Sequence, residues 1–535
     1  MMRKKKITQL IVCFSVVFSV AWAGASFPKD GLLHRDTSVN VIDVDTKRQL
    51  LVDDYLVERL SGGAERRLHR PVPQEIVIEH DEPWEGSYCN NHSIFKDGNM
   101  YRMYYASVHY NVQEGKVIDD EHGFFLCYAE SDDGIHWRKP HLGLFEFEGS
   151  KNNNIVLTED ETSGVRVAAS SAAVFIDENP DATADAKYKA VIASYTEIGG
   201  VPRGAMVFKS ADAIHWFPMS KSPVFSGGSF DSQNVGFWDA GSQLYRAYWR
   251  YMAGEDKIRS IRTATSPDFV NWDNYHDLRY VNSPEEHLYN NVIKSYYRAP
   301  DVIVGFPIRY IERPWSVAME ALPELDHRRL RSSSVERFGT ALTEGLFMTS
   351  RDGVTFNRWN EAFLPPGIER PGTWNYGHQF IGWTMVETTS ALYNELNELS
   401  FYAVEGNWTG HSTSLRRYTL RLDGFVSINA PLSGGELLTK PMVFGGDELQ
   451  LNYSSAAAGG ILVELLDEDG NPIPGYSQAD SDPIFGDTIC RIARWRGSAD
   501  LTPLIGKVVQ VRFILADADL YSFKFDRNEV RDNQK

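Results

Sequence analysis

The sequence predicts an all-β protein, a five-bladed β-propeller followed by a C-terminal β-sandwich. The first observation is a turn motif that recurs in the middle of the chain, at residues 131–137 (SDDGIHW), 210–216 (SADAIHW), 266–272 (SPDFVNW) and 350–356 (SRDGVTF). Each copy follows a strand-like run, carries Asp or Gly at its tip and returns with an aromatic residue. A repeated unit that cannot bury its own face requires neighbours stacked around an axis, which predicts a propeller.

The second observation is a pair of strands ahead of each turn. Residues 93–105 (SIFKDGNMYRMYY) give a strand, an Asp-Gly turn and a second strand with alternating aromatics, as in a β-hairpin. Comparable pairs of strands begin near residues 173, 235, 292 and 379. The last of these repeats ends in a degenerate copy of the turn at 418–426. We therefore count five blades and assign the propeller to residues 40–430.

The third observation is that the sequence pattern changes near residue 430. After Pro431-Leu432-Ser433-Gly434-Gly435, short alternating strands follow, for example at 448–453 and 508–513. This predicts a β-sandwich over residues 431–527 and a polar tail over 528–535. A long insertion rich in Arg and Glu, at 313–338, is expected to form a loop or short helix over one face of the propeller.

The first 23 residues have the pattern of a cleavable signal peptide. Arg3 to Lys6 are basic, residues 7–20 are apolar but too short for a comfortable membrane span, and Ala21-Trp22-Ala23 is a cleavage site. We expect a secreted or periplasmic protein from which Cys13 is removed. The remaining Cys89, Cys127 and Cys490 exclude a disulfide scaffold.

Composition narrows the possible partners. The net charge is −18 and the pI is about 5.3, which argues against nucleic acid and anionic membranes. No later apolar run has the length of a membrane-spanning helix. No His, Asp and Glu spacing suggests a transition-metal site, so we predict neither a metal nor a cofactor. The oligomeric state stays open.

Residues just ahead of the innermost propeller strands converge on the axis and line the mouth of a funnel. The candidates for substrate binding at these and neighbouring positions are Asn90, Asn91, His92, Arg166, Gln233, His287, Arg298, Arg309, Glu369, Arg370, Trp374 and His378. The arginines suit an anionic sugar, because a guanidinium fork matches a carboxylate or sulfate. Ion pairing within an acidic protein is the alternative for the arginines, and a bond to a neighbouring blade is the alternative for the histidines.

Carboxylates at the same positions are candidates for catalysis. Glycoside hydrolysis needs two carboxyl groups on either side of the bond that breaks. Asp231 and Glu286 occupy matched positions on successive blades and form the predicted pair, with Glu85 as a further catalytic candidate. A turn or cap acceptor is the alternative role for each.

Five stretches carry a resemblance to a known group: 131–137, 142–157 (LGLFEFEGSKNNNIVL), 231–239 (DSQNVGFWD), 286–300 and 415–426. With them the chain resembles the five-bladed propeller glycoside hydrolases of families 32, 43, 62, 68, 117 and 130, and specifically bacterial proteins labelled as having a family 32 N-terminal domain. The resemblance covers nearly the whole mature chain, since a β-sandwich also follows the propeller in family 32.

The resemblance implies acidic residues at the starts of blades one, two and three. Only Asp231 in blade three complies, because blade one presents Asn90-Asn91-His92 and blade two presents Ser170-Ser171. The Asn-Asp-Pro and Arg-Asp-Pro signatures of family 32 are also absent, so an invertase-like activity on fructose units is not expected.

These observations together predict an exported glycoside hydrolase that cleaves a polysaccharide or oligosaccharide in the propeller funnel with paired carboxylates. Two alternatives remain open. The missing carboxylates of blades one and two favour a non-catalytic carbohydrate-binding propeller. The arginines favour a sialidase-like or phosphorylase-like enzyme that acts on an anionic sugar.

Overall fold

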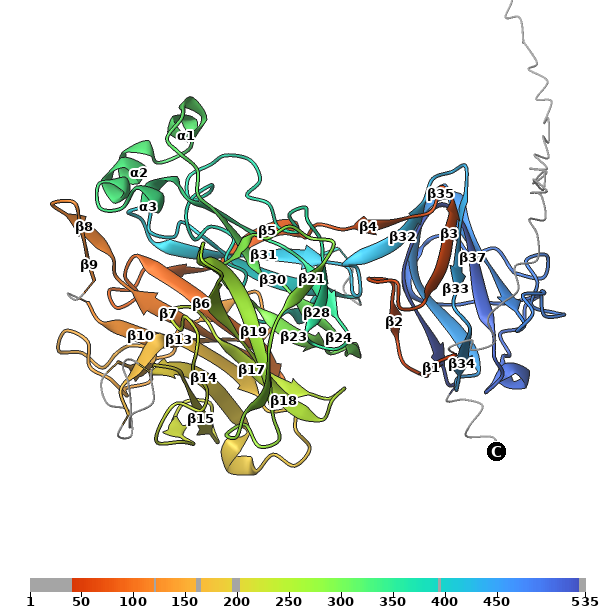
Figure 1. Cartoon of the computed structure of the whole chain (residues 1–535), viewed down its shortest axis with the longest axis horizontal. Helices are drawn as coiled ribbons and strands as arrows, with labels where there is room; N and C mark the ends of the chain where they lie inside the picture. The colour runs from red at the N-terminus through yellow and green to blue at the C-terminus, as the bar shows by residue number, and fades with distance from the viewer. Residues whose placement is uncertain (1–40, 120–121, 160–164, 195–202, 393–395, 529–535) are drawn as a thin grey trace, which may run out of the picture. The chain divides into compact units, whose positions relative to one another are not determined.

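The computed structural model describes residues 41–119, 122–159, 165–194, 203–392 and 396–528. Strands and loops dominate these residues, so the predicted all-β class is confirmed (Figure 1). The predicted signal peptide with Cys13, and residues 529–535 of the predicted tail, lie outside the described residues. Among the residues that are described, no helix is long and apolar enough to cross a membrane.

Sheets of four or five strands follow one another along the chain, as expected for a propeller, and we number them in chain order. The first contains β6 (Tyr88–Asp97), β7 (Met100–Val108), β10 (Phe124–Ser131), β11 (Trp137–Arg138) and β12 (Ile155–Thr158). The second contains β13 (Val167–Ile176), β14 (Tyr188–Ser194), β15 (Ala205–Ser210) and β16 (Phe217–Pro218). The third contains β17 (Val235–Asp239), β18 (Leu244–Ala253), β19 (Ile258–Ser266) and β20 (Asp273–Asp277).

Two further sheets continue the series. The fourth contains β23 (Ile293–Tyr296), β24 (Ala299–Gly305), β27 (Met348–Ser350), β28 (Thr355–Arg358) and β21 (Arg279–Val281). The fifth contains β29 (Val386–Thr389), β30 (Asn397–Glu405), β31 (Thr413–Leu420) and β5 (Val72–His80). Because β5 precedes the first sheet in the chain and pairs in the fifth, it ties the two ends of the series together.

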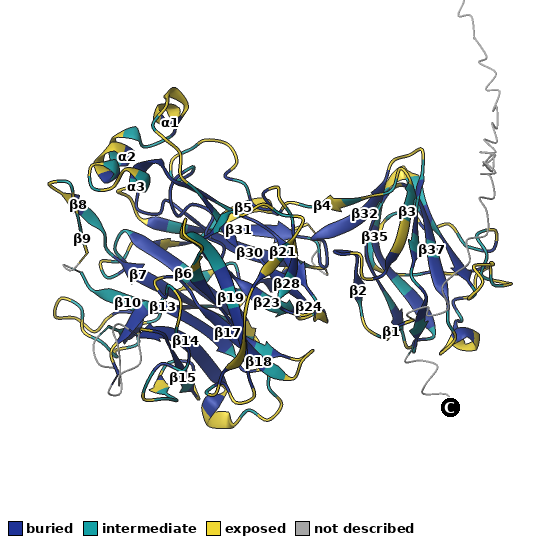
Figure 2. Cartoon of the chain, viewed as in Figure 1, coloured by how far each residue is buried: buried dark blue, intermediate teal, exposed yellow. Residues whose placement is uncertain are grey.

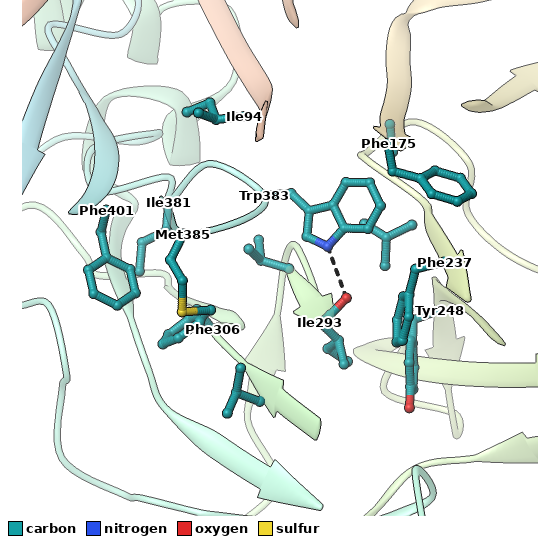
Figure 3. Close-up of a cluster of buried hydrophobic side chains, with 14 of the residues drawn as sticks. Ile94, Phe175, Phe237, Tyr248, Ile293, Phe306, Ile381, Trp383, Met385 and Phe401 are labelled. Carbon is teal, nitrogen blue, oxygen red and sulfur yellow. Dashed lines mark hydrogen bonds between the residues drawn. The ribbon is translucent and has the colours of Figure 1, made fainter. Parts of the chain in front are cut away.

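The predicted inner segment of the fifth sheet, residues 379–383, pairs with β30 and also contacts the first sheet. Gln379 N donates to Val404 O at 3.0 Å, and Gly382 N donates to Tyr402 O at 2.8 Å. Trp383 N then donates to His92 O at 2.7 Å, which joins this segment to β6 of the first sheet. Figure 3 shows the Trp383 indole in the core between the sheets, where it donates to Ile293 O at 2.9 Å.

The recurring turn motif has the same hydrogen bonds in every copy, which explains its residue types. Ser131 Oγ accepts from Gly134 N at 2.9 Å, and Asp133 Oδ1 accepts from the next two backbone N–H groups, both at 2.8 Å. The Ser and Asp of the other three copies accept the equivalent bonds. Short polar side chains stabilise such turns by replacing backbone partners. The predicted turns are therefore confirmed.

The C-terminal part forms one large curled sheet around a core of its own. Its strands are β2 (Gln49–Leu50), β3 (Val57–Gly62), β4 (Glu65–Leu68), β32 (Val426–Ala430), β33 (Gly435–Thr439), β35 (Glu448–Leu466), β36 (Asp487–Ile492) and β37 (Gln510–Asp526). The pairing of β35 with β37 shifts register between Ser455 and Gly460, and side chains from both sides of this break share one core. That this part is a sandwich stays a prediction.

The first strands of the described chain pair with C-terminal strands and not with the propeller sheets. In addition to β2, β3 and β4, β1 (Ile42–Asp45) pairs with β34 (Met442–Phe444). The assignment of all of residues 40–430 to the propeller is corrected here for residues 42–68 and 426–430. Val44, Leu51 and Leu56 are buried in the C-terminal core, and an alternating pattern does not show which sheet a strand joins.

The remaining elements are additions to the repeated plan. The insertion contains α1 (Val317–Ala321), α2 (Leu325–Ser332) and α3 (Glu336–Thr340), which confirms the predicted short helix. A small sheet of β22 (His287–Leu288), β25 (Ile308–Ile311) and β26 (Leu342–Gly345), a hairpin of β8 (Asn111–Gln113) and β9 (Lys116–Ile118), and the single-turn 3₁₀ helices η1 (Ala184–Ala186) and η2 (Thr502–Leu504) complete the elements. Figure 2 shows these helices and this hairpin as more exposed than the buried inner strands.

Candidate functional site

A cavity of about 380 Å³ opens where the inner strands of the propeller begin, and we call it the axial cavity. This volume lies within the range of small-molecule sites. Its lining residues are Tyr88, Asn90, Asn91, Val108, Tyr110, Val117, Asp119, Ser170, Asp231, Ser232, Tyr289, Asn290, Arg337, Phe338, Tyr376 and Trp408. The prediction that residues ahead of the inner strands meet at one place therefore holds for Asn90, Asn91 and Asp231.

The polar part of the axial cavity is built from inner strands and from residues just ahead of them. Asn91 Nδ2 donates to Ser170 O at 2.8 Å, and Asn290 Nδ2 donates to Asn91 Oδ1 at 3.3 Å. The strand β6 shifts register between Asn90 and Ser93, and Asn91 has a positive φ of 52°. Such a bulge turns side chains out of the alternating pattern. The amides of the first and fourth sheets thus meet on the axis.

An aromatic wall faces this polar part. The Tyr110 ring lies 5.1 Å from Tyr88 and 5.3 Å from Trp408, and Trp408 lies 5.2 Å from Phe338. Tyr376 Oη donates to Tyr289 Oη at 2.7 Å. Burial raises the pKa of the Tyr88 and Tyr110 hydroxyls, so both stay protonated at neutral pH. Flat apolar rings beside hydroxyl and amide groups suit a ligand with both apolar and polar faces.

Asp231 is an ionised carboxylate of the axial cavity. It forms an ion pair with Arg250, whose guanidinium also lies 4.7 Å from the centre of the Tyr289 ring. Burial acts to raise the pKa of Asp231, but the charge and hydrogen bond of Arg250 outweigh it and the pKa is lowered. The Asp231 side chain is 58% exposed, so a charged carboxylate faces the cavity.

Asp119 is a second carboxylate of the axial cavity, and the sequence reasoning missed it. It follows β9 of the hairpin, and it lines the same cavity as Asp231. The pKa of Tyr110 is raised by burial first, and also by the negative charges of Asp119 and Asp231. Both carboxylates therefore act on one tyrosine hydroxyl. The available signal was weak: an acidic residue just after a short hairpin with Gly115 at its turn.

The structure does not bring Glu286 into the axial cavity. Glu286 forms ion pairs with Arg309 and Arg358, each at 2.9 Å, and lines an outer pocket with His287, Arg259 and Arg309. Asp231 comes four residues before the inner strand β17, whereas Glu286 comes just before β22 of the small extra sheet. That extra strand separates Glu286 from the inner strand β23. The predicted pair is thus divided between two pockets.

Glu85 lies in a buried network beside the cavity. Its carboxylate accepts from Tyr105 Oη at 2.6 Å, from Lys139 Nζ at 2.7 Å and from His80 Nδ1 at 3.3 Å. Burial acts to raise the pKa of Glu85, but His80 and Lys139 lower it to about 2. His92 joins this network through His80, 3.1 Å away between the two Nε2 atoms. Glu85 and His92 are therefore buried, hydrogen-bonded residues of the interior.

The other predicted binding residues are spread over several places. Gln233 donates to Asn91 O at 2.8 Å beneath the cavity, and burial lowers the pKa of His378 to about 3 in the interior. Glu369 is exposed, and Trp374 Nε1 donates to Gly367 O at 2.8 Å. The arginines pair with carboxylates: Arg298 with Asp423, Arg309 with Glu286 and Glu344, Arg370 with Glu405, and Arg166 lies near Glu159.

Several other cavity residues that were not predicted come from two kinds of position. Tyr88 lies on β6 two residues before Asn90, so strand alternation places both on one face. Tyr110, Val117, Arg337 and Phe338 come from the hairpin and the insertion, whose positions no repeat pattern indicates. The length of the insertion was the available signal, since long insertions in compact domains are commonly functional.

No protein-family model matches the sequence, and no curated protein matches it. Among solved structures, the chain is similar to a glycoside hydrolase family 43 arabinoxylan arabinofuranohydrolase from Bacillus subtilis in complex with cellotetraose, with 12% identity, 86% of this chain and 99% of that chain covered, and a TM-score of 0.40. It is also similar to a structure from work on the GH130 family of mannoside phosphorylases, a family that contains glycoside hydrolases that target β-1,2 mannosidic linkages in Candida mannan. Here the identity is 14%, 70% of this chain and 96% of that chain are covered, and the TM-score is 0.37.

A third similar structure is an N-acetylgalactosamine deacetylase from F. plautii in complex with blood group B trisaccharide. Here the identity is 12%, 67% of this chain and 95% of that chain are covered, and the TM-score is 0.39. Families 43 and 130 of the sequence resemblance thus recur among the similar structures, while the family 32 part stays a prediction. At these identities and TM-scores, the similarities assign neither a family nor an activity to this chain.

Proposed function

We propose that this protein is a carbohydrate-active enzyme that hydrolyses a glycosidic bond of a polysaccharide or oligosaccharide in the axial cavity. The observation that supports this most is an exposed, ionised carboxylate, Asp231, inside a cavity of amides and aromatic rings. Amide groups hydrogen-bond hydroxyl groups, and aromatic rings pack against the apolar faces of a sugar. The charged carboxylate adds a group that can react.

The two carboxylates that the described residues bring to the cavity take different roles in this proposal. Asp231 is held ionised by Arg250, which fits a nucleophile or general base. Asp119 lines the same cavity and is the proposed general acid. Glu286 has no part in the reaction, because its carboxylate is ion-paired with Arg309 and Arg358 outside the axial cavity.

We also propose that the enzyme is secreted or periplasmic. This part rests on the basic, apolar and Ala-Trp-Ala segments within residues 1–23. Expression with and without residues 1–23, followed by fractionation of the cells, tests it. Recovery of the full-length chain, unprocessed, in the cytoplasm would contradict export.

A panel of oligosaccharides tests the proposed hydrolysis and separates the two roles. The wild type and the variants Asp231→Asn and Asp119→Asn are assayed for sugar release, first on natural glycosides and then on aryl glycosides with a good leaving group. A general acid is needed least when the leaving group is already stable. Asp119→Asn should therefore lose activity on natural glycosides and keep much of it on activated ones, whereas Asp231→Asn should lose both. Activity of Asp231→Asn on both would overturn the assignment.

Carbohydrate binding without cleavage is the second candidate, and one observation favours it. Asp231 is already engaged by a cation, and the predicted partner Glu286 lies outside the cavity. Calorimetry on the same panel distinguishes the two functions. If the wild type binds an oligosaccharide but forms no product after long incubation with natural and activated glycosides, carbohydrate binding without cleavage is supported and hydrolysis is excluded.

A further inference from the structure

The arginines of the molecule fall into two groups that differ in their partners. The predicted anion-binding residues Arg298, Arg309 and Arg370 are each bonded to a carboxylate. Within the axial cavity, Arg250 is likewise paired with Asp231. Those charges are compensated inside the protein and do not require a ligand.

Arg337 differs from these arginines. It lies on α3, is half-buried and lines the axial cavity. Burial acts to lower the pKa of Arg337, but a hydrogen bond with the Tyr310 hydroxyl outweighs it and the pKa is raised, so the group stays charged. Among the described residues, no carboxylate forms an ion pair with Arg337. A charged guanidinium fork therefore lines the cavity with no ion-pair partner among the described residues.

A second cation lies behind the same wall. Arg331 of α2 is fully buried, with its guanidinium 5.7 Å from the centre of the Trp408 ring, and Trp408 lines the axial cavity. None of its three guanidinium nitrogens has a hydrogen-bond partner within the described residues. Burial, with help from nearby Arg328, lowers the pKa of Arg331 to about 9, so the group is charged at neutral pH. The Glu324 carboxylate offsets part of this charge, and the remaining positive charge in a low-dielectric wall attracts an anion into the cavity.

We propose that the substrate is a uronate, a sugar that carries a carboxylate, and that Arg337 binds this carboxylate in the axial cavity. This inference rests on the proposed carbohydrate function and narrows its substrate class. A planar carboxylate matches the planar guanidinium fork with two parallel bonds. Its single charge also limits repulsion from the ionised Asp231 in the same cavity, which a phosphate with two charges would increase.

The experiment compares acidic oligosaccharides with the same chains after reduction of their carboxylates to alcohols. Oligomers of galacturonate, glucuronate and mannuronate, each with its reduced counterpart, and one sulfated galactan oligomer are titrated into the protein by calorimetry. The variant is Arg337→Met. The matched control is Arg329→Met on α2, which removes the same charge from an exposed arginine that pairs with Glu320 at 3.3 Å. Thermal unfolding checks that both variants are folded.

The wild type should bind one acidic oligomer about 10- to 100-fold more tightly than its reduced form, as expected for charge-assisted bonds. Arg337→Met should remove this preference by weakening binding of the acidic oligomer, and Arg329→Met should keep the preference. Equal binding of acidic and reduced forms, or tighter binding of the sulfated oligomer, would overturn the uronate inference while the carbohydrate function stands. If neither acidic nor neutral sugars bind, the proposed function itself fails.

Discussion

Asp231 and Glu286 occupy comparable positions in the sequence, and the structure gives them different surroundings. Asp231 pairs with one arginine, lines the axial cavity and keeps 58% of its side chain exposed. Glu286 bonds to two arginines, lines the outer pocket and keeps 21% exposed. A carboxylate with one cation and free solvent access remains available to a ligand. A carboxylate held by two cations at a sheet edge mainly connects segments of the chain.

The largest expected effect is on catalysis, from Asp231→Asn. The substitution keeps the shape of the side chain and removes its negative charge, so hydrolysis should fall by about 10²- to 10⁴-fold. Binding of the oligosaccharide should change little. The measurement is kcat on the substrate that the panel identifies, with calorimetry for binding.

Glu286→Gln is the matched control for that substitution, because it makes the same chemical change in the other pocket. Its hydrolysis rate should stay near that of the wild type. If Glu286→Gln abolished hydrolysis and Asp231→Asn did not, the contrast between the two pockets would be reversed.

The next effect is on pH dependence, from Arg250→Met. In the wild type, Arg250 lowers the pKa of Asp231, so activity that needs the ionised carboxylate is lost only as the pH falls through that lowered value. Without the cation, burial raises the pKa, and the acidic limb of the kcat/KM profile should move to higher pH. On the acidic side of the new limb, kcat/KM should fall about tenfold for each pH unit below it. Arg309→Met should leave the limb in place, and a limb that also stayed in place in Arg250→Met would contradict the role of Arg250.

The third effect is on stability, from Glu286→Gln. Glu286 accepts a charge-assisted hydrogen bond from Arg309 and forms an ion pair with the buried Arg358, so the free energy of unfolding should fall by about 1–3 kcal/mol. Urea unfolding measures it. Glu320→Gln, which breaks the exposed pair with Arg329, serves as control and should cost about 0.5 kcal/mol or less. Equal losses in the two variants would show that Glu286 is not a structural carboxylate.

The smallest effect is on sugar affinity, from Trp408→Ala. Trp408 packs against Tyr110 and Phe338 in the aromatic wall, and loss of such a ring contact should weaken binding about 3- to 10-fold. Calorimetry with the substrate measures the change. Tyr275→Ala, at an exposed ring on β20 of the third sheet, is the control and should bind like the wild type. A Trp408→Ala variant with unchanged affinity would place the sugar away from this wall.

Much of the propeller could be predicted from local pattern. Ser131 and Asp133, and their counterparts in the other three turns, were recognised because each turn satisfies its hydrogen bonds within a few residues. Asn90, Asn91 and Asp231 were found for a related reason: their places before or at the start of inner strands bring them to the axis. Contacts of this kind depend on neighbours in the chain.

Other features depend on residues far apart in the sequence. The joining of β2 to β37 brings together Gln49 and Phe523, and no alternation of polar and apolar residues indicates that partner. The placement of Glu286 depends on β22 pairing with β25, which inserts a small sheet ahead of the inner strand β23.

The sequence by itself determined the all-β class, the repeated turns and the axial position of Asp231, because these follow from hydrogen bonds and side-chain alternation over short distances. Only the tertiary structure decided which charges face the axial cavity. Arg337 lies on an insertion and Asp119 follows a hairpin, and both line the cavity. Glu286 lies outside it, ion-paired with Arg309 and Arg358. The availability of a charged group depends on its partners in space, and those partners are set by packing between distant segments.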